Sequence, residues 1–467
     1  MTVDLDAWTA HLAEPFRGRP VIDAFKILAG MTGHVEKLKE WGAERPLLIA
    51  HGQGTGPLPS PDDADIHLLD LGSASSMSDE VRIAARLAED PPPDVVRRVE
   101  EYDPERRAVW WLPPFGGHGT LLGRPVVGGR RKAWARLEDK LLCEEIWDSA
   151  DVPREPARVV RAERGPLLAA TAPVRGDAGA VWAGDTREGV NGGGDFVRWI
   201  ETEADADRAL AYFAEHCDQV RVMPFLEGVP CSIHGFVLDD GVAAFRPVEL
   251  VMLKHRPTNT FRLGGMSTWW DPGDDDRSAM RALVQRVGAL LADRVDYRGG
   301  FGVDGVLTRQ GFRPTELNPR FTGGLMSPAR GIPEVPLELL QLNAAAGRAP
   351  GITAPALEGL VVEATDASRF AHAVGLCDHP WGSTETAEAQ LARIDGRLDV
   401  ASDGAPVVGA MQAGPAVTDG TFVRFTPAAG ALRPGDRLAT LHSEALAFAD
   451  RHWGCTFGEL EIAAAVR

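Results

Sequence analysis

The sequence predicts a multidomain protein that mixes helices and strands. Strand and helix signals alternate over residues 1–125, which is typical of an open α/β domain with parallel strands. A long amphipathic helix runs into two short strands between residues 278 and 325. Short strands separated by Gly and Pro turns follow residue 351. At 467 residues the chain can form two to four domains. We expect three, spanning 1–125, 126–350 and 351–467.

The bulk composition narrows the class of protein. The net charge of −18 argues against nucleic acid or an anionic membrane as the main partner, because both attract basic surfaces. Five widely spaced cysteines without a C-x-x-C pair indicate reduced thiols rather than a disulfide framework or a zinc site. The N-terminus lacks the pattern of a signal peptide, and no apolar run has the length of a membrane span. We therefore expect a cytoplasmic protein.

The N-terminal region alternates apolar runs, typical of buried strands, with helical segments. The strands are expected at 46–50, 66–71 and 108–112, and the helices at 23–42 and 78–90. A glycine-rich turn at 52–56 lacks the spacing of a dinucleotide-binding loop, and Pro57 and Pro59 follow it in place of a helix. We expect this turn to line a substrate or to serve a structural purpose.

The middle of the chain begins with a predicted helix over 133–150, which contains Asp139 and Lys140. Residues 155–227 should then form a small lid, with strand-like runs at 158–160, 166–170 and 179–183 and a helix over 201–217. A glycine-rich loop, residues 188–194, lies within it. Backbone N–H groups of such a loop can wrap around phosphate oxygens.

Three oxygen-bearing side chains occur on the two strands that follow the amphipathic helix. We expect strands over 301–308 and 312–318. Alternate residues of a strand share a face, so Glu316 and Asn318 point the same way and Asp304 can lie opposite them. Two carboxylates and an amide oxygen suit Mg2+ shared with nucleotide phosphates. The alternative is an ordinary solvated face.

The residues that follow favour the metal site. Asn318-Pro319-Arg320 leads to a Gly-Gly pair, and Asp304, Glu316, Asn318 and Arg320 together resemble the metal-binding signature of the ATP-grasp superfamily. That resemblance implies an ATP-grasp fold with an α/β domain before it and a small β-rich domain after it. It also implies ATP as co-substrate and two Mg2+ ions, or Mn2+, on Asp304, Glu316 and Asn318. Arg320 would then neutralise the transferred phosphoryl group.

The same resemblance implies the residues that bind ATP. Lys140 would reach the phosphates, and Gly192, Gly193 and Gly194 would fold over them. The family usually carries a second lysine on the strand before this loop, but residues 180–185 contain none, and Arg187 is the nearest cation. The segment 219–230 resembles the adenine hinge. This match places Met223, Phe225 and Leu226 along the base and Glu227 on the ribose, although Phe225 and Leu226 could equally be core residues.

A basic cluster follows the hinge. Arg246, Lys254, Arg256 and Arg262 fall within 17 residues of an otherwise acidic chain. Positive charge of this kind stabilises a transferring phosphoryl group and attracts a carboxylate. We assign catalytic roles to Arg246, Lys254 and Arg256 beside Arg320. The alternative is an exposed basic strand.

The C-terminal region is predicted to be β-rich, with strands near 359–363, 405–409 and 421–425 and a closing helix over 443–453. It resembles the small domain that follows the grasp in biotin-carboxylase-like and purine-pathway relatives. The sequence leaves open whether it packs against the site or forms a homodimer.

Three functions remain in view. The first is an ADP-forming ligase that couples the carboxylate of an amino acid or peptide to an amine through an acyl phosphate. The second is a carboxylase or thioester-forming ligase on the same framework. The third is a nucleotide-binding protein without chemistry, which the missing lysine favours and the full metal-binding set opposes.

Overall fold

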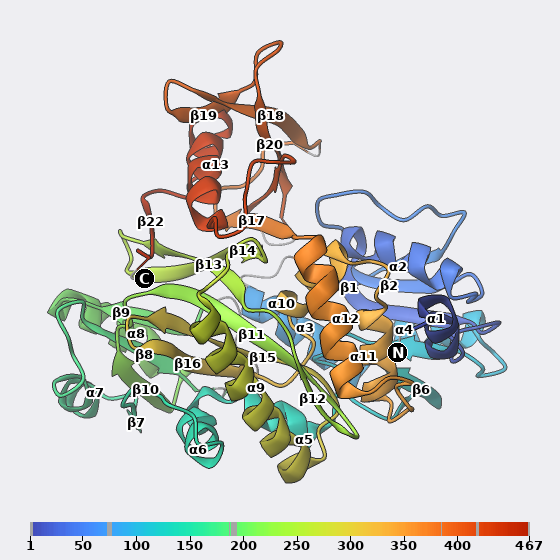
Figure 1. Cartoon of the computed structure of the whole chain (residues 1–467). Coiled ribbons are helices and arrows are strands. Elements are labelled where there is room, and N and C mark those ends of the chain that lie inside the picture. The colour runs from blue at the N-terminus through green and yellow to red at the C-terminus, as the bar shows by residue number, and fades with distance from the viewer. Residues whose placement is uncertain are drawn as a thin grey trace.

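The protein, as a computed structural model, is described over residues 3–71, 77–185, 187, 194–383, 385–416 and 420–465. Figure 1 shows an N-terminal portion with its own sheet beside a larger portion, from which C-terminal strands and the last helix project. Within the described residues, the helices are too short or too polar to cross a lipid bilayer.

The N-terminal sheet has the strand order β3-β2-β1-β4-β6-β5, in which β5 alone runs antiparallel to its neighbour. The parallel α/β arrangement expected here is confirmed. Its strands are β1 (Val21–Ile27), β2 (Leu47–Gly52), β3 (Asp65–Leu68), β4 (Val109–Trp111), β5 (Thr120–Leu121) and β6 (Arg124–Val127). Its helices are α1 (Leu5–Leu12), α2 (Leu28–Glu40), α3 (Met77–Glu89) and α4 (Pro93–Tyr102). The helix expected from residue 23 starts only at Leu28, because residues 21–25 are buried on both faces as a central parallel strand.

The segment that we expected to be one helix over 133–150 is broken into four short pieces. These are α5 (Lys132–Ala135), the 3-10 turns η1 (Arg136–Glu138) and η2 (Lys140–Leu142), and α6 (Cys143–Ser149). Asp139 adopts an extended backbone, and its carboxylate accepts a hydrogen bond from the Leu141 N–H at 3.0 Å. The aspartate therefore ends one turn and caps the next, as short acidic side chains commonly do.

The lid forms a small unit with its own apolar core. It consists of β7 (Arg158–Arg161), α7 (Arg164–Thr171), β8 (Ala180–Gly184), β9 (Val197–Ile200), α8 (Glu203–His216) and β10 (Gln219–Pro224). The strand expected at 166–170 is wrong, since these residues belong to α7. Leu167, Ala170 and Thr171 are buried at helical spacing, and a short apolar run does not by itself distinguish a helix from a strand.

The large sheet carries the two strands on which the sequence argument rests. It contains β11 (Val229–Leu238), β12 (Gly241–Ala244), β13 (Val248–His255), β14 (Thr260–Ser267), β15 (Gly299–Thr308) and β16 (Gly311–Asn318), with α9 (Asp274–Val295) packed on it. The predicted amphipathic helix and the two following strands are confirmed. β15 pairs antiparallel with both β11 and β16.

The C-terminal strands continue this sheet through the pairing of β14 with β17. The remaining elements are α10 (Gly323–Gly331), α11 (Leu337–Ala345), α12 (Ala354–Ala367), β17 (Ala371–Cys377), β18 (Ala387–Ile394), β19 (Arg397–Val400), β20 (Val407–Pro415), β21 (Thr421–Pro427), α13 (Leu438–Trp453) and β22 (Leu460–Ile462). The strand expected at 359–363 is wrong: these residues lie in α12, which Thr353 caps and which buries Leu357 and Val361 at i, i+4 spacing.

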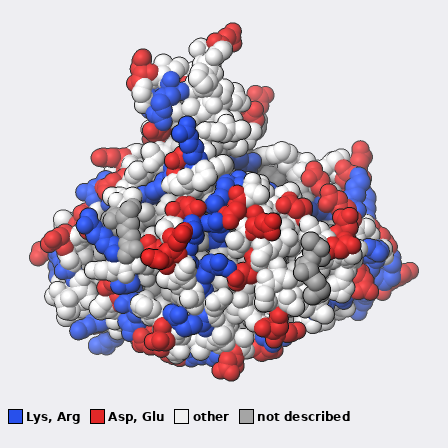
Figure 2. Space-filling model, in the orientation of Figure 1, with Lys and Arg blue, Asp and Glu red and all other residues white. Residues whose placement is uncertain are grey.

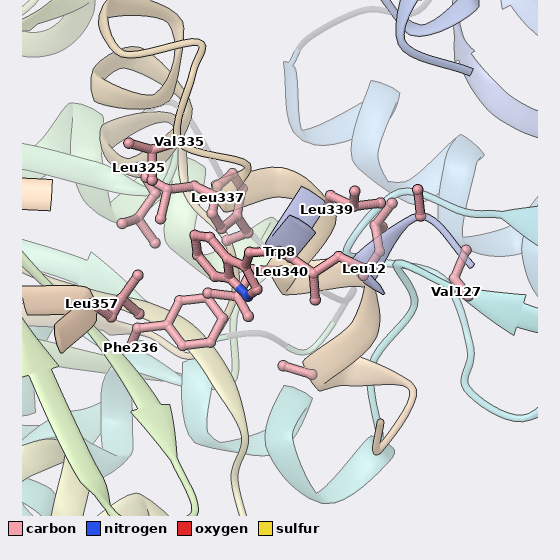
Figure 3. Packing of buried hydrophobic residues seen from close by; sticks show 14 of the residues in the cluster. Trp8, Leu12, Val127, Phe236, Leu325, Val335, Leu337, Leu339, Leu340 and Leu357 are labelled. Atoms are coloured by element: carbon pink, nitrogen blue, oxygen red, sulfur yellow. The ribbon is translucent and has the colours of Figure 1, made fainter. Parts of the chain in front are cut away.

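A shared core joins the N-terminal and central portions (Figure 3). Trp8 and Leu12 of α1 pack with Leu340 of α11 and with Phe236 of β11. The Trp8 indole also donates a hydrogen bond to the Pro350 carbonyl at 2.8 Å. The glycine-rich turn at 52–56 provides a second link, because the Thr55 hydroxyl donates to the carbonyl at the end of β20. These contacts hold the three portions around a common space.

Candidate active site

A cavity of about 1300 Å3 lies between the lid, the large sheet, α10 and the C-terminal strands. Its size exceeds that of a pocket for one drug-sized ligand, so it has room for a nucleotide and a second substrate. Figure 2 shows acidic and basic side chains interspersed on the visible face of the protein, whose net charge is −18.

One wall of the cavity brings together the three predicted metal ligands. Asp304 on β15 lies directly opposite Glu316 on β16 in the strand register. The Asn318 Nδ2 donates a hydrogen bond to Asp304 Oδ2 at 2.9 Å. All three residues line the cavity. The period-2 alternation of the strands therefore places them together as the sequence pattern indicated.

The charge of this group fits a divalent cation. Burial, and then repulsion from Glu316, raise the pKa of Asp304 to about 6. Two carboxylates that destabilise each other's charge are stabilised by a hard cation with oxygen ligands. Among the described residues, no three His, Cys, Asp or Glu side chains form a complete metal cage. A cation held here would take further ligands from phosphates, as Mg2+ commonly does.

Lys140 extends this charged wall from η2. Its ammonium group lies 2.9 Å from Glu316 Oε1 and is almost completely buried. Burial lowers the pKa of Lys140, but attraction to Glu316 outweighs it, so the pKa is raised overall and the group stays charged. The structure thus brings Lys140 to the acidic pair, where a phosphate entering the cavity would meet it.

Arg320 is held rigidly beside the same group. Its Nε donates to Glu138 Oε1 at 2.8 Å, and its Nη2 donates to Asn318 Oδ1 at 3.1 Å. The guanidinium also lies 5.0 Å from the centre of the Phe115 ring. Burial raises the pKa of Glu138, but the guanidinium groups of Arg320 and Arg130 outweigh this and hold it at about 2. A permanently ionised Glu138 therefore fixes Arg320 at the cavity wall.

The predicted hinge lines another part of the cavity with apolar groups. Met223, Phe225 and Leu226 are among the lining residues, but Glu227 is exposed outside the lining. The Phe225 ring lies 5.0 Å from the ring of Trp199 and 6.4 Å from that of Phe261. This aromatic group offers a flat apolar surface of the kind on which a purine base stacks.

The predicted phosphate loop is only partly described. Gly194 lines the cavity, with φ of 87° and its Cα facing the Phe261 carbonyl, where a Cβ would lie 3.2 Å from the oxygen. Gly192 and Gly193 lie outside the described residues. Arg187 does not line the cavity; its guanidinium pairs with Asp218 at 3.0 Å.

The basic cluster divides into residues that line the cavity and residues that do not. Lys254 lines the cavity at the hinge end, 4.7 Å from the Trp199 ring, and pairs with Glu461. Arg256 and Arg246 do not line it. Arg256 pairs with Glu201 at 3.1 Å.

Arg246 pairs with Asp271 at 3.0 Å and with Asp366. Leu250, Met252 and Lys254 face the cavity at alternate positions of β13, whereas Arg246 precedes the strand and Arg256 follows it. The expectation that Arg246 and Arg256 join the reacting groups therefore does not agree with their placement.

Three further polar residues at or behind this wall were not predicted from the sequence. Ser232 of β11 lies opposite Asp304 in the strand register, and His234 Nε2 lies 3.0 Å from the Ser232 hydroxyl. Burial lowers the pKa of His234 to about 3, so the imidazole is neutral. Arg221 of β10 donates hydrogen bonds to Glu144 from Nε at 2.9 Å and from Nη2 at 2.6 Å. The signal in the sequence that could have identified such residues is a polar side chain at alternate positions of an otherwise apolar strand.

Comparisons with known proteins show which solved structures have a similar fold. No protein-family model matches the chain, and no curated protein matches its sequence. Solved structures do match. The biotin carboxylase domain of Hydrogenobacter thermophilus 2-oxoglutarate carboxylase, in complex with MgADP, ADP and bicarbonate, has a TM-score of 0.54 at 14% identity, covering 88% of this chain and 87% of that one.

Two other structures agree. Biotin carboxylase from Campylobacter jejuni has a TM-score of 0.52 at 12% identity, with 87% of each chain covered. Phosphoribosylamine–glycine ligase from Thermotoga maritima has a TM-score of 0.50 at 13% identity, covering 95% of this chain and 97% of that one. These proteins share the ATP-grasp fold, and at such low identity the likeness establishes the fold alone. The chain has the ATP-grasp fold.

Proposed function

We propose that this protein is an ATP-dependent, ADP-forming ligase that activates a carboxylate as an acyl phosphate and couples it to an amine. The observation that carries the proposal is the grouping of Asp304, Glu316, Asn318, Lys140 and Arg320 on one wall of a large cavity in an ATP-grasp fold. The name of one similar structure, phosphoribosylamine–glycine ligase, supports the amine as acceptor.

The proposed position of ATP follows from the two ends of the cavity. The purine would stack at the Phe225 end, and the triphosphate would extend toward Lys140 and the acidic pair. Asp304, Glu316 and Asn318 would hold Mg2+, which supplies charge neutralisation for the phosphate oxygens. Lys140 would exchange its contact with Glu316 for a phosphate oxygen, since a lysine binds phosphate as a point charge.

The reaction proceeds in two displacements. A carboxylate oxygen of the first substrate attacks the γ-phosphorus, the bond to the bridging oxygen breaks, and ADP leaves. The amine nitrogen then attacks the acyl carbon, inorganic phosphate leaves, and the nitrogen loses a proton. Arg320, fixed by Glu138, would stabilise the negative charge that spreads over the transferring phosphoryl oxygens. Because positioning and charge do the work, the mechanism needs no protein nucleophile.

A carboxylase is the second candidate, because two of the similar structures are biotin carboxylases and one of them contains bicarbonate. In that case bicarbonate would be the carboxylate that is phosphorylated. The framework and the wall of charged residues would be the same, but the phosphorylated substrate and the product would differ.

A nucleotide-release screen tests the proposal. Purified protein is incubated with MgATP and a panel of amino acids and dipeptides, singly and in pairs, and ADP and AMP are separated by chromatography. We expect ADP and phosphate in amounts that match an amide product. Release of AMP and pyrophosphate would overturn the mechanism. ADP formation that requires labelled bicarbonate, with the label retained in the product, would move the enzyme to the carboxylase class.

A further inference from the structure

A second group of basic residues lies at the side of the cavity formed by α10 and the C-terminal strands. It consists of Arg330 in the last turn of α10, His372 on β17 and Arg424 on β21. We call it the Arg330–Arg424 cluster. Within the described part of the chain, neither arginine has a carboxylate within ion-pair distance. By contrast, Lys140 and Arg320 on the acidic wall each have one.

The strand register puts the cluster on the cavity side of the sheet. His372 lies opposite Met266 of β14, and Val374 lies opposite Arg424 of β21. Directly opposed residues share a face, as do residues two apart along a strand. Met266, His372 and Val374 all line the cavity, and Arg330 lines it from α10. Arg424 therefore lies on the same face, beside lining residues.

Among the residues that the structure describes, neither arginine of the cluster has an acidic partner; Arg330 is exposed, and the half-buried Arg424 lies 5.8 Å from the centre of the Phe422 ring. The Arg424 Nε is buried and has no hydrogen-bond partner. Burial, followed by the charges of Arg330, Arg424 and His442, lowers the pKa of His372 to about 4, so the imidazole between the two arginines is neutral. Burial and Arg330 also lower the pKa of Arg424. Two guanidinium groups that repel each other and have no counter-ion within the described ranges favour a bound anion.

We propose that the Arg330–Arg424 cluster binds an anionic group, a carboxylate or a phosphate, that the second substrate carries in addition to its reacting atoms. Both anions suit the planar fork of arginine, and His372 can donate one further hydrogen bond. The proposal rests on the proposed function, because it assigns this end of the cavity to a substrate. It narrows the substrates to molecules with an anionic group at a distance from the bond that forms.

Direct binding tests the site without turnover. Inorganic phosphate and succinate are titrated separately into the protein, with adenylyl imidodiphosphate and Mg2+ present at saturation to fill the nucleotide end. Arg330→Gln and Arg424→Gln are compared with wild type. Arg393→Gln serves as a matched control, because Arg393 is a surface arginine of β18 that pairs with Glu444 at 2.7 Å. Circular dichroism checks that each variant is folded.

We expect one of the two anions to bind at millimolar concentration, and each cluster variant to weaken it by about tenfold or more, the effect of losing a charge-assisted hydrogen bond. Arg393→Gln should bind as wild type does. Binding of phosphate alone indicates a phosphorylated substrate, and binding of succinate alone indicates a second carboxylate. Wild type that binds neither, or cluster variants that bind as tightly as wild type, would overturn the proposal.

Two control measurements separate failure of this proposal from failure of the proposed function. If adenylyl imidodiphosphate and Mg2+ do not bind, the proposed function is contradicted. The anion titration is then repeated without the nucleotide analogue, so that anion binding is measured independently of it. Once a substrate pair is found, Arg330→Gln should raise KM for the anionic substrate at nearly unchanged kcat. A fall in kcat at unchanged KM would place Arg330 in the chemistry instead and contradict an anchoring role.

Discussion

Replacing Glu316 by glutamine tests whether this residue binds the metal ion, because it should reduce activity far more than stability. The change keeps the shape of the side chain and removes its charge, so the acidic pair is left with Asp304 alone. Loss of one preorganised charge-stabilising group typically costs about 10²–10³-fold in kcat. A carboxylate that also holds a cation belongs at the upper end. We therefore expect about a 10³-fold loss, equivalent to ~4 kcal/mol of activation free energy.

The stability of this variant should change much less. Breaking a fully buried ion pair costs about 3–5 kcal/mol of unfolding free energy. The Glu316 side chain is 25% exposed, however, and glutamine can still accept a hydrogen bond from Lys140. The change also removes the repulsion that, after burial, raises the pKa of Asp304. These effects offset each other, and we expect a loss of about 1 kcal/mol.

Glu155→Gln is the matched control. Glu155 pairs with Arg313, also on β16, at 2.9 Å and with similar exposure, but neither residue lines the cavity. Both variants are assayed for ADP release over a range of Mg2+ concentrations and for thermal unfolding. The two should unfold at similar temperatures, with activity lost only in Glu316→Gln. Turnover of Glu316→Gln at the wild-type rate with unchanged Mg2+ dependence would refute the metal assignment.

Three further variants test other parts of the structure. Arg320→Lys keeps the charge but loses the fork held by Glu138, so kcat for ADP formation should fall about 10²-fold with the KM for ATP nearly unchanged. Phe225→Ala removes the stacking surface and should weaken binding of a fluorescent ATP analogue about tenfold, whereas a core role alone would lower the melting temperature and leave affinity intact. Arg124 contacts the buried Asp103 at 2.6 Å, so Arg124→Met leaves that carboxylate without its partner. The free energy of unfolding in urea at neutral pH should fall by about 3–5 kcal/mol. Burial raises the pKa of Asp103, but bonds from Arg124 outweigh it and the pKa is lowered overall, so the pair stabilises the fold above the ordinary pKa of aspartate. The difference from wild type should therefore shrink as the pH falls through the pKa of folded Asp103, and a difference that stays constant would contradict this.

The sequence predicted the site best on the strands, where the two-residue alternation of side chains determines both the local structure and the face on which each residue lies. The alternation in β15 and β16 places Asp304, Glu316 and Asn318 on one face whatever surrounds them. Short apolar runs were ambiguous instead. Residues 166–170 and 359–363 are long enough for a strand, yet each lies inside a helix whose buried residues recur every three or four positions. Tertiary contacts decide such segments, because their local pattern fits both states.

The rest of the site depends on pairings between distant segments, which a single sequence does not reveal. His372 reaches the cavity because β17 joins β14, and Arg424 lies beside lining residues because β21 joins β17. Arg246 and Arg256 looked equivalent to Lys254 in the sequence. The limits of β13 place Lys254 at the cavity and leave the two arginines in ion pairs away from its lining.

The strand without a lysine shows how the fold can supply charge from a neighbouring strand. Ala183 of β8 lies directly opposite Arg221 of β10, so the arginine side chain occupies the same face of the lid sheet. Arg221 lines the cavity, but Glu144 and the Thr315 carbonyl, at 2.7 Å from Nη1, already accept its hydrogen bonds. If the cavity takes ATP as proposed, a guanidinium held in this way would act on the phosphates through its fixed charge, because direct contact would require it to release the partly buried Glu144 carboxylate. Arg221 would then supply, from the adjacent strand, the cation that residues 180–185 lack.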